Sequence, residues 1–109
     1  MPMGPTGLVH YRLLHAEIKS AVDKLREQCP EVVDVSYTMR EDSTGDPSLF
    51  FRIVLADEAT SEDTIANTAR RIRTLLYDEI KPIENWGMFA YVNFNSFSEQ
   101  QRRVDPKLA

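Results

Sequence analysis

Hydrophobic residues change their spacing repeatedly along the chain, and each change predicts a new element. Between residues 8 and 28 they recur every three or four positions with charged residues between them, which predicts an amphipathic helix. Pro30 disfavours helical geometry at Cys29 and therefore ends this helix. In residues 31–39 and 48–56 the period falls to two, which predicts two strands. The segment 40–47 is polar and rich in turn-forming residues, so the strands are expected to form a hairpin.

The two predicted strands differ in how their faces are composed. The first alternates clearly, and the side expected to face a core carries Val33, Val35, Tyr37 and Met39. The second is apolar on both sides, because Leu49, Phe51, Ile53 and Leu55 alternate with Phe50, Arg52 and Val54. We therefore expect the second strand to lie centrally or to have a covered second face.

A second helix is predicted after residue 60. Thr60 or Ser61 is expected to cap it, and Glu62 and Asp63 suit the positive end of the helix dipole. Its buried stripe is formed by Ile65, Ala69, Ile72, Leu75, Leu76 and Ile80. Pro82 is expected to close this helix and to begin a connecting turn.

Residues 86–97 are rich in aromatic side chains and predict a third strand. One face carries Met88, Ala90, Val92 and Phe94, and the other carries Phe89, Tyr91, Asn93, Asn95 and Phe97. A strand, a helix and a parallel return strand form a right-handed crossover in nearly all proteins. The order α-β-β-α-β thus predicts a two-layer α+β sandwich, with two helices on one face of a mixed three-stranded sheet.

The chain length fits one domain, which we place at residues 7–97. Residues 1–6 are expected to form a flexible lead-in, and the polar residues 98–109 are expected to fray as a C-terminal tail. Hydrophobic residues make up 42% of the 109 residues and charged residues 28%, as in ordinary globular domains. Neither a signal peptide nor a long apolar run is evident, so we expect a soluble, cytoplasmic protein without a membrane segment.

Charge and candidate chemistry narrow the function classes. The formal net charge of -4 opposes the phosphate attraction on which most nucleic-acid binding depends. His10 and His15 lie about 140° apart on a helix and cannot share a metal there. The single Cys29 can form no internal disulfide and has no base paired with it by sequence. We predict no cofactor, metal or catalytic site, and an enzyme is the least supported class.

The sequence points instead to an uncovered apolar sheet face. With both helices on one side, the other side carries Phe50 and Val54 with one face of the third strand, which is formed either by Phe89, Tyr91 and Phe97 or by Met88, Val92 and Phe94. The predicted interface is formed by Phe50, Val54, Phe89, Tyr91 and Phe97. The simplest partner is a second copy of the chain, and another protein is the next. In the alternative, Trp86 and the residues after Phe97 fold back and cover this face.

Three functions follow, in order of support. The first is a non-enzymatic, homodimeric interaction module that acts as an adaptor or regulatory partner. The second is a small-ligand-binding regulatory domain, with a cleft beside Trp86 or Tyr91 and polar contacts from Arg52, Asn93 and Asn95. The third is an RNA-binding accessory factor that uses Arg70, Arg71 and Arg73. Because Arg71 and Arg73 lie about 200° apart on a helix, a solvated helical face is favoured over that third function.

Overall fold

The computed structural model describes residues 4–104 and the side chains of residues 11–102. The long helices and the strands follow one another in the predicted order, and additional short helices lie between and after them. Their bounds are α1 Gly4–Gln28, β1 Val32–Glu41, β2 Pro47–Leu55, the 3₁₀ helix η1 Asp57–Thr60, α2 Ile65–Ile80, α3 Pro82–Trp86, β3 Phe89–Ser96 and α4 Phe97–Val104.

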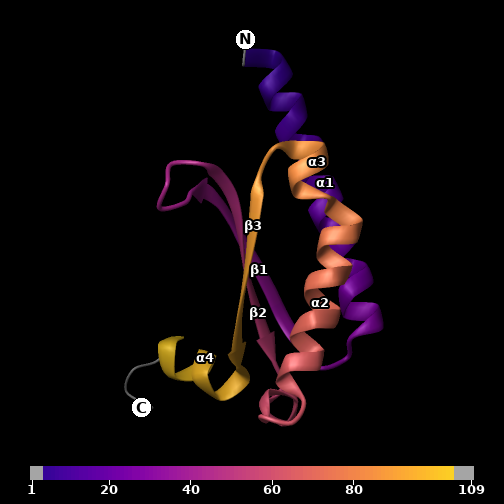
Figure 1. The fold of residues 1–109 in the computed structure, drawn as a ribbon, viewed down its shortest axis with the longest axis vertical. Coiled ribbons are helices and arrows are strands. Elements are labelled where there is room, and N and C mark those ends of the chain that lie inside the picture. Colours follow the sequence, from indigo (N-terminus) through magenta and orange to yellow (C-terminus); the bar gives the residue numbers. More distant parts are fainter. Residues whose placement is uncertain (1–3, 105–109) are drawn as a thin grey trace.

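The sheet has three strands in the order β1-β2-β3. β1 and β2 form the predicted hairpin and pair antiparallel, whereas β3 returns parallel to β2. Figure 1 shows α1 and α2 together on one face of the sheet and α4 at one end of the opposite face. The predicted α+β class and the mixed three-stranded sheet are therefore confirmed.

The core lies between the sheet and the two long helices. β2 supplies its centre, since Leu49, Phe51, Ile53 and Leu55 are each at most 1% exposed. α1 and α2 contribute the other large buried side chains, namely Leu14, Ile18, Leu25, Ile72, Leu76 and Ile80. The helices thus cover one face of this central strand, and Val54 on the other face is also buried, which agrees with the apolar character of β2 on both sides.

The predicted inner face of β1 is wrong at one residue. The pairing register between β1 and β2 shifts between Val32 and Asp34, which is a bulge around Val33. Val32 is consequently buried, while Val33 is 39% exposed. A bulge inserts one extra residue and so reverses the alternation that precedes it, which period-two reasoning alone does not detect.

The start of the second helix was also predicted too early. Thr60 donates its hydroxyl to the carbonyl of Asp57 and so belongs to η1, and a turn over residues 61–64 follows. α2 begins at Ile65, and Thr64 occupies its N-cap without a side-chain capping bond. Lys81 ends α2 in the left-handed region at φ 48°, after which the predicted turn contains α3.

The polar C-terminal segment does not fray where it is described. Residues Phe97–Val104 form α4, where the sequence predicted a tail. Asp57 holds the start of this helix, because its carboxylate accepts hydrogen bonds from the backbone N–H of Ser98 at 3.0 Å and from its hydroxyl. At the other end of the chain α1 already begins at Gly4, earlier than predicted, and residues 1–3 lie outside the described residues.

Candidate functional site

The sheet face opposite α1 and α2 carries polar and aromatic side chains in rows. Pairing registers align Ser36, Arg52 and Asn93 across the three strands. The next row toward the hairpin turn is formed by Thr38, Phe50 and Tyr91. We call this surface the open face. It is bounded by the hairpin turn at one end and by α4 at the other (Figure 1).

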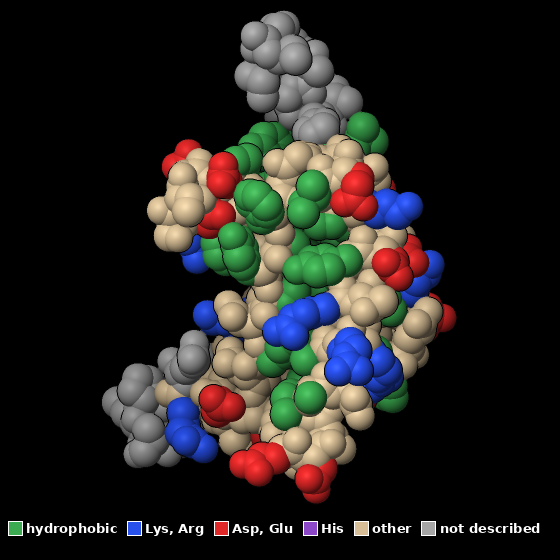
Figure 2. Space-filling model, in the orientation of Figure 1, with side chains coloured by type: hydrophobic (Ala, Val, Ile, Leu, Met, Phe, Trp, Pro, Cys, Tyr) green, Lys and Arg blue, Asp and Glu red, His purple; other side chains and the backbone are tan. Residues whose placement is uncertain are grey.

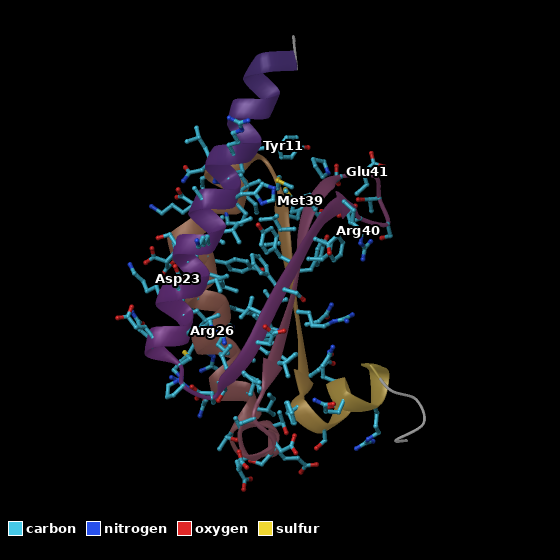
Figure 3. The ribbon with its side chains drawn as sticks, turned by 180° about the vertical axis from the view of Figure 1, so that it is seen from behind. Tyr11, Asp23, Arg26, Met39, Arg40 and Glu41 are labelled. Carbon is cyan, nitrogen blue, oxygen red and sulfur yellow. The ribbon has the colours of Figure 1, made fainter. Side chains whose placement is uncertain are left out.

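Three side chains of the open face stack on one another. The guanidinium of Arg40 lies 3.7 Å from the centroid of the Phe50 ring, and Phe50 stacks on Tyr91 with centroids 5.1 Å apart. Figure 3 shows Arg40 on the side of β1 away from the helices, whereas Met39 points toward them. A guanidinium over an aromatic face is attracted by the ring quadrupole, so this stack orders side chains from all three strands.

Asp42 anchors that stack to the hairpin turn. Its Oδ1 accepts hydrogen bonds from the backbone and hydroxyl of Thr44 and from the backbone of Asp46, at 2.7–3.0 Å. Its Oδ2 accepts a bond of 2.9 Å from the Tyr91 hydroxyl. The hydrogen bonds from Thr44 are the largest cause of a strongly lowered pKa of Asp42, and the bond to Asp42 raises the pKa of Tyr91.

β3 is an edge strand, and one hydrogen bond shows which of its backbone N–H and C=O groups point away from the sheet. The Ala90 carbonyl accepts a hydrogen bond of 2.8 Å from the hydroxyl of Tyr77 on α2, beyond the sheet. Backbone groups of successive strand residues point to opposite edges. The N–H and C=O groups of Ala90, Val92 and Phe94 therefore point outward. No other backbone partner for these groups lies within residues 4–104.

Exposed apolar side chains border the β3 edge. Tyr77, Ile83, Phe89 and Tyr91 are between 42% and 59% exposed. They surround a shallow hollow of about 370 Å³ between α2, α3 and β3, which Lys81 and Asp78 also line. Figure 2 shows hydrophobic side chains gathered over the upper half of β3 and beside α2. We call this surface, together with the outer backbone of β3, the β3 patch.

The other edge of the sheet is protected. β1 carries the bulge at Val33, whose carbonyl accepts a hydrogen bond of 3.1 Å from Arg26 of α1. It also bears three charged residues, Asp34, Arg40 and Glu41. Charges and bulges are the usual means by which proteins prevent pairing at an edge strand. β3 has neither, since Phe89–Ser96 contains no charged residue and no proline and pairs with β2 in a continuous register.

The predicted interface residues divide between exposed and covered positions. Phe50, Phe89 and Tyr91 lie on the open face as expected, with Phe89 and Tyr91 more than 40% exposed. Val54 is only 3% exposed, because α4 packs against β2 and β3 at that end. Its assignment to an uncovered interface is therefore wrong. Phe97 is 43% exposed but belongs to α4 rather than to the strand.

The predicted ligand contacts are only partly brought together. Arg52 and Asn93 are register partners on the open face, whereas Asn95 is buried at the end covered by α4. Trp86 packs against the hydrophobic core on the helical side. Of the two positions expected for a pocket, beside Trp86 or beside Tyr91, the described residues form a hollow beside Tyr91, and Trp86 does not line it.

The three helical arginines do not form one basic surface. Arg71 forms an ion pair of 2.7 Å with Glu31, and the guanidinium of Arg73 lies 5.2 Å from the centroid of Phe94. Arg70 lies with Arg71 on one shallow surface, which Asp78 and Glu79 also border. The structure thus agrees with the expectation that Arg71 and Arg73 point apart, whereas Arg70 and Arg71 line the same surface.

Two other side chains with reactive groups, Cys29 and His15, are engaged in packing or hydrogen bonding. Burial raises the pKa of the Cys29 thiol, and the imidazole of His15 hydrogen-bonds the Tyr37 hydroxyl. The side chain of His10 lies outside those described. In the described part of the chain, no three His, Cys, Asp or Glu side chains are grouped closely enough to hold a metal ion. No helix there combines the length and hydrophobicity needed to cross a membrane.

Comparisons with known proteins add no likeness to this geometry. A scan against protein-family models and searches of the curated proteins and of the solved structures each found no match. The open face and the β3 patch are therefore the features from which a function can be inferred.

Sequence reasoning missed three contributors to these surfaces, namely Tyr77, Ile83 and Arg40. The predicted buried stripe of the second helix does not include Tyr77, and Ile83 belongs to the predicted connecting turn. Arg40 was placed in the loop, although one further step of the period-two pattern puts it on the side of Phe50. A longer strand prediction would have found Arg40, whereas the contact of Tyr77 with β3 depends on tertiary packing.

Proposed function

We propose that this protein is a non-enzymatic interaction module that forms a homodimer by pairing the β3 strands of two copies. The observation that carries the proposal is the composition of β3. It is an edge strand with outward backbone groups, no charge, no proline and no bulge, and exposed apolar side chains border it. Such an edge invites pairing with another strand.

A second copy of the chain, related by a twofold axis, can supply hydrogen-bond partners for the outward backbone groups of β3. In an antiparallel pair across a twofold axis, the outward N–H groups of Ala90, Val92 and Phe94 meet outward C=O groups of the same set in the partner. Because β3 is uncharged, the pairing places no like charges opposite each other. The Ala90 carbonyl has a second lone pair, so it can keep its bond from Tyr77.

The resulting dimer would have a continuous six-stranded sheet. The twofold axis of an antiparallel pair is perpendicular to the sheet, so α2 of both copies would lie on one side. Ile83 and Phe89 would lose solvent exposure near the new interface. Burial of such apolar surface supplies roughly 25 cal/mol per Å², in addition to the backbone hydrogen bonds.

The proposal is tested by sedimentation velocity of the intact chain and of a Phe89→Asp variant. The mass derived from sedimentation of the unmodified protein is expected to be twice the 12.5 kDa of one chain. Phe89→Asp places a carboxylate beside the paired strands and should weaken dimerisation at least about tenfold, which corresponds to about 1.4 kcal/mol.

Val33→Asp is the matched control, because it introduces the same charge at the other sheet edge, at a residue of similar exposure. This variant should remain dimeric, and circular dichroism should show that both variants are folded. A monomer at every concentration of the unmodified protein would contradict the proposal. Equal weakening by Val33→Asp and Phe89→Asp would contradict the assignment of the interface to β3.

A further inference from the structure

The centre of the open face contains a polar hollow that is distinct from the β3 patch. It measures about 290 Å³, and its polar side chains come from Ser36, Thr38, Arg40, Arg52 and Asn93. These residues belong to all three strands, and the pairing register places Ser36, Arg52 and Asn93 side by side. Figure 2 shows the molecule hollowed between the hairpin and α4, with lysine or arginine side chains bordering the hollow.

Every polar side chain of this hollow can donate a hydrogen bond. The two guanidinium groups, two hydroxyls and one amide provide donors, and no carboxylate is among the lining residues. Asp34 lies one row beyond Ser36 on β1 and is paired with Arg26. The carboxylate of Asp42 is already occupied by Thr44, Asp46, Ser48 and Tyr91. The charge inside the hollow is therefore positive although the whole chain carries a net charge of -4.

Among the described side chains, the two arginines of the hollow have no counter-ion, a property that they share with Arg12, Arg70 and Arg73 but not with Arg26 and Arg71. Arg26 is paired with Asp34, and Arg71 with Glu31. Within the described side chains neither Arg40 nor Arg52 forms an ion pair or donates a hydrogen bond to protein. The contact of Arg40 with Phe50 orients its guanidinium but leaves its charge and its N–H donors available.

We propose that this hollow binds the phosphoryl group of a small phosphorylated molecule. Guanidinium groups match phosphate oxygens with paired N–H donors, and bonds to an ionised acceptor are about twice as strong as neutral ones. The hydroxyl groups on β1 and the amide on β3 lie beside the arginines, and they suit an acceptor with several oxygens. The rest of the ligand would lie along the open face between the hairpin turn and α4.

This site is independent of the proposed dimer. Its residues lie on the open face, whereas the dimer uses the outer backbone of β3, so a six-stranded sheet would present both hollows on one side. Phe89 shares the register row of Arg40 on the open face, so the carboxylate of Phe89→Asp would disturb the hollow. Binding is therefore measured in the unmodified protein, below and above its dimerisation range, and equal affinities are expected. A protein that stays monomeric at every concentration would leave the binding result interpretable.

The test is an NMR titration of the ¹⁵N-labelled chain with inorganic phosphate and with glucose 6-phosphate, in 150 mM sodium chloride. Glucose is the neutral control. We expect saturable shifts at the side-chain N–H signals of Arg40, Arg52 and Asn93 with both phosphates and none with glucose. Tighter binding of the sugar phosphate than of inorganic phosphate would show that the ligand extends along the face.

Substitutions distinguish specific binding of phosphate in this hollow from a general attraction of phosphate to positively charged side chains. Arg52→Gln should weaken phosphate binding at least about tenfold, and Arg52→Lys should weaken it less, because the charge remains while the paired donors are lost. Arg12→Gln removes the same charge from an exposed position on α1 and should leave the affinity unchanged.

Two results would overturn the proposal. The first is a set of linear, non-saturating shifts spread over basic side chains and equal in Arg52→Gln, which would mean general ionic attraction. The second is binding of a single-stranded oligonucleotide at this face without measurable binding of glucose 6-phosphate, which would assign the surface to nucleic acid.

Discussion

Asp42 shows how one side chain joins a turn to a functional surface. Its two oxygens accept hydrogen bonds from the hairpin turn and from Tyr91 on β3. Tyr91 in turn stacks on Phe50, which lies beneath Arg40. The carboxylate therefore orders a turn and, through two rings, one guanidinium of the proposed phosphoryl site.

The pKa of Asp42 predicts how acid affects stability. A folded-state pKa lowered below the ordinary 3.8 means that the fold favours the ionised carboxylate. The stabilisation is complete above about pH 4 and is lost as the pH falls through the lowered folded-state pKa. Asp42→Asn should thus lower the melting temperature at pH 7, and the difference from the unmodified protein should shrink in acid.

Thermal unfolding followed by circular dichroism between pH 7 and pH 2 measures this difference. Glu62→Gln is the control, since that exposed carboxylate accepts no hydrogen bond from the described residues. It should leave the curve nearly unchanged. A constant difference between Asp42→Asn and the unmodified protein across this range would show that the ionised form of Asp42 contributes no stability.

Adjacent leucines on α1 provide a prediction for the core. Leu14 is 1% exposed and packs in the core, whereas Leu13 is 58% exposed. Leu14→Ala should reduce the free energy of unfolding by about 2–5 kcal/mol, because transfer and cavity costs add. Leu13→Ala should change it by less than about 0.5 kcal/mol. Chemical denaturation measures both, and equal losses would contradict the orientation of α1.

At the scale of elements, the spacing of hydrophobic residues correctly predicted which side chains face the core. The core-facing residues of β2, such as Leu49 and Phe51, were predicted because their alternation reflects the packing of one face against helices. The bulge at Val33 was missed because no distinctive residue type marks it. The later start of α2 was missed because Thr60, although a good capping residue, bonds within η1 instead.

The candidate sites were less predictable than the fold, for a physical reason. Strand alternation correctly grouped Phe89, Tyr91 and Asn93 on one face of β3, but it did not decide whether that face or the Met88 face stays uncovered. Which part of that face stays uncovered depends on α4, a helix with little apolar sequence signal that Asp57 holds from a distant part of the chain. Local patterns contain no information about such a tertiary contact.

α4 has a consequence for both proposals. It covers the end of the open face that holds Val54 and Asn95, and it leaves the rows of Arg52 and Phe50 accessible. A sheet that was open along its whole length would offer a larger apolar surface for face-to-face association. With that end covered, the edge of β3 is the longer uncharged surface, which favours pairing of strands over stacking of sheets.

At the scale of the whole molecule, the proposed dimer makes specific amides change together. The N–H groups of Ala90, Val92 and Phe94 point outward and have no backbone partner within residues 4–104. In a β3–β3 dimer they become hydrogen-bonded, and amide exchange with solvent slows when a bond must open first. We expect their protection to increase at least about tenfold when the protein concentration is raised through the dimerisation range.

The inner amides of β3 and the β1 edge provide internal references for the same experiment. Tyr91 and Asn93 bond toward β2 in the monomer, so association should change their exchange much less. Val35 lies on the opposite strand of the sheet and should not respond to concentration. Protection that rises at Val35 but not at Val92 would place the interface at β1. Uniform protection along the chain would instead indicate a general gain in stability, because only strand pairing protects alternate residues of a single edge.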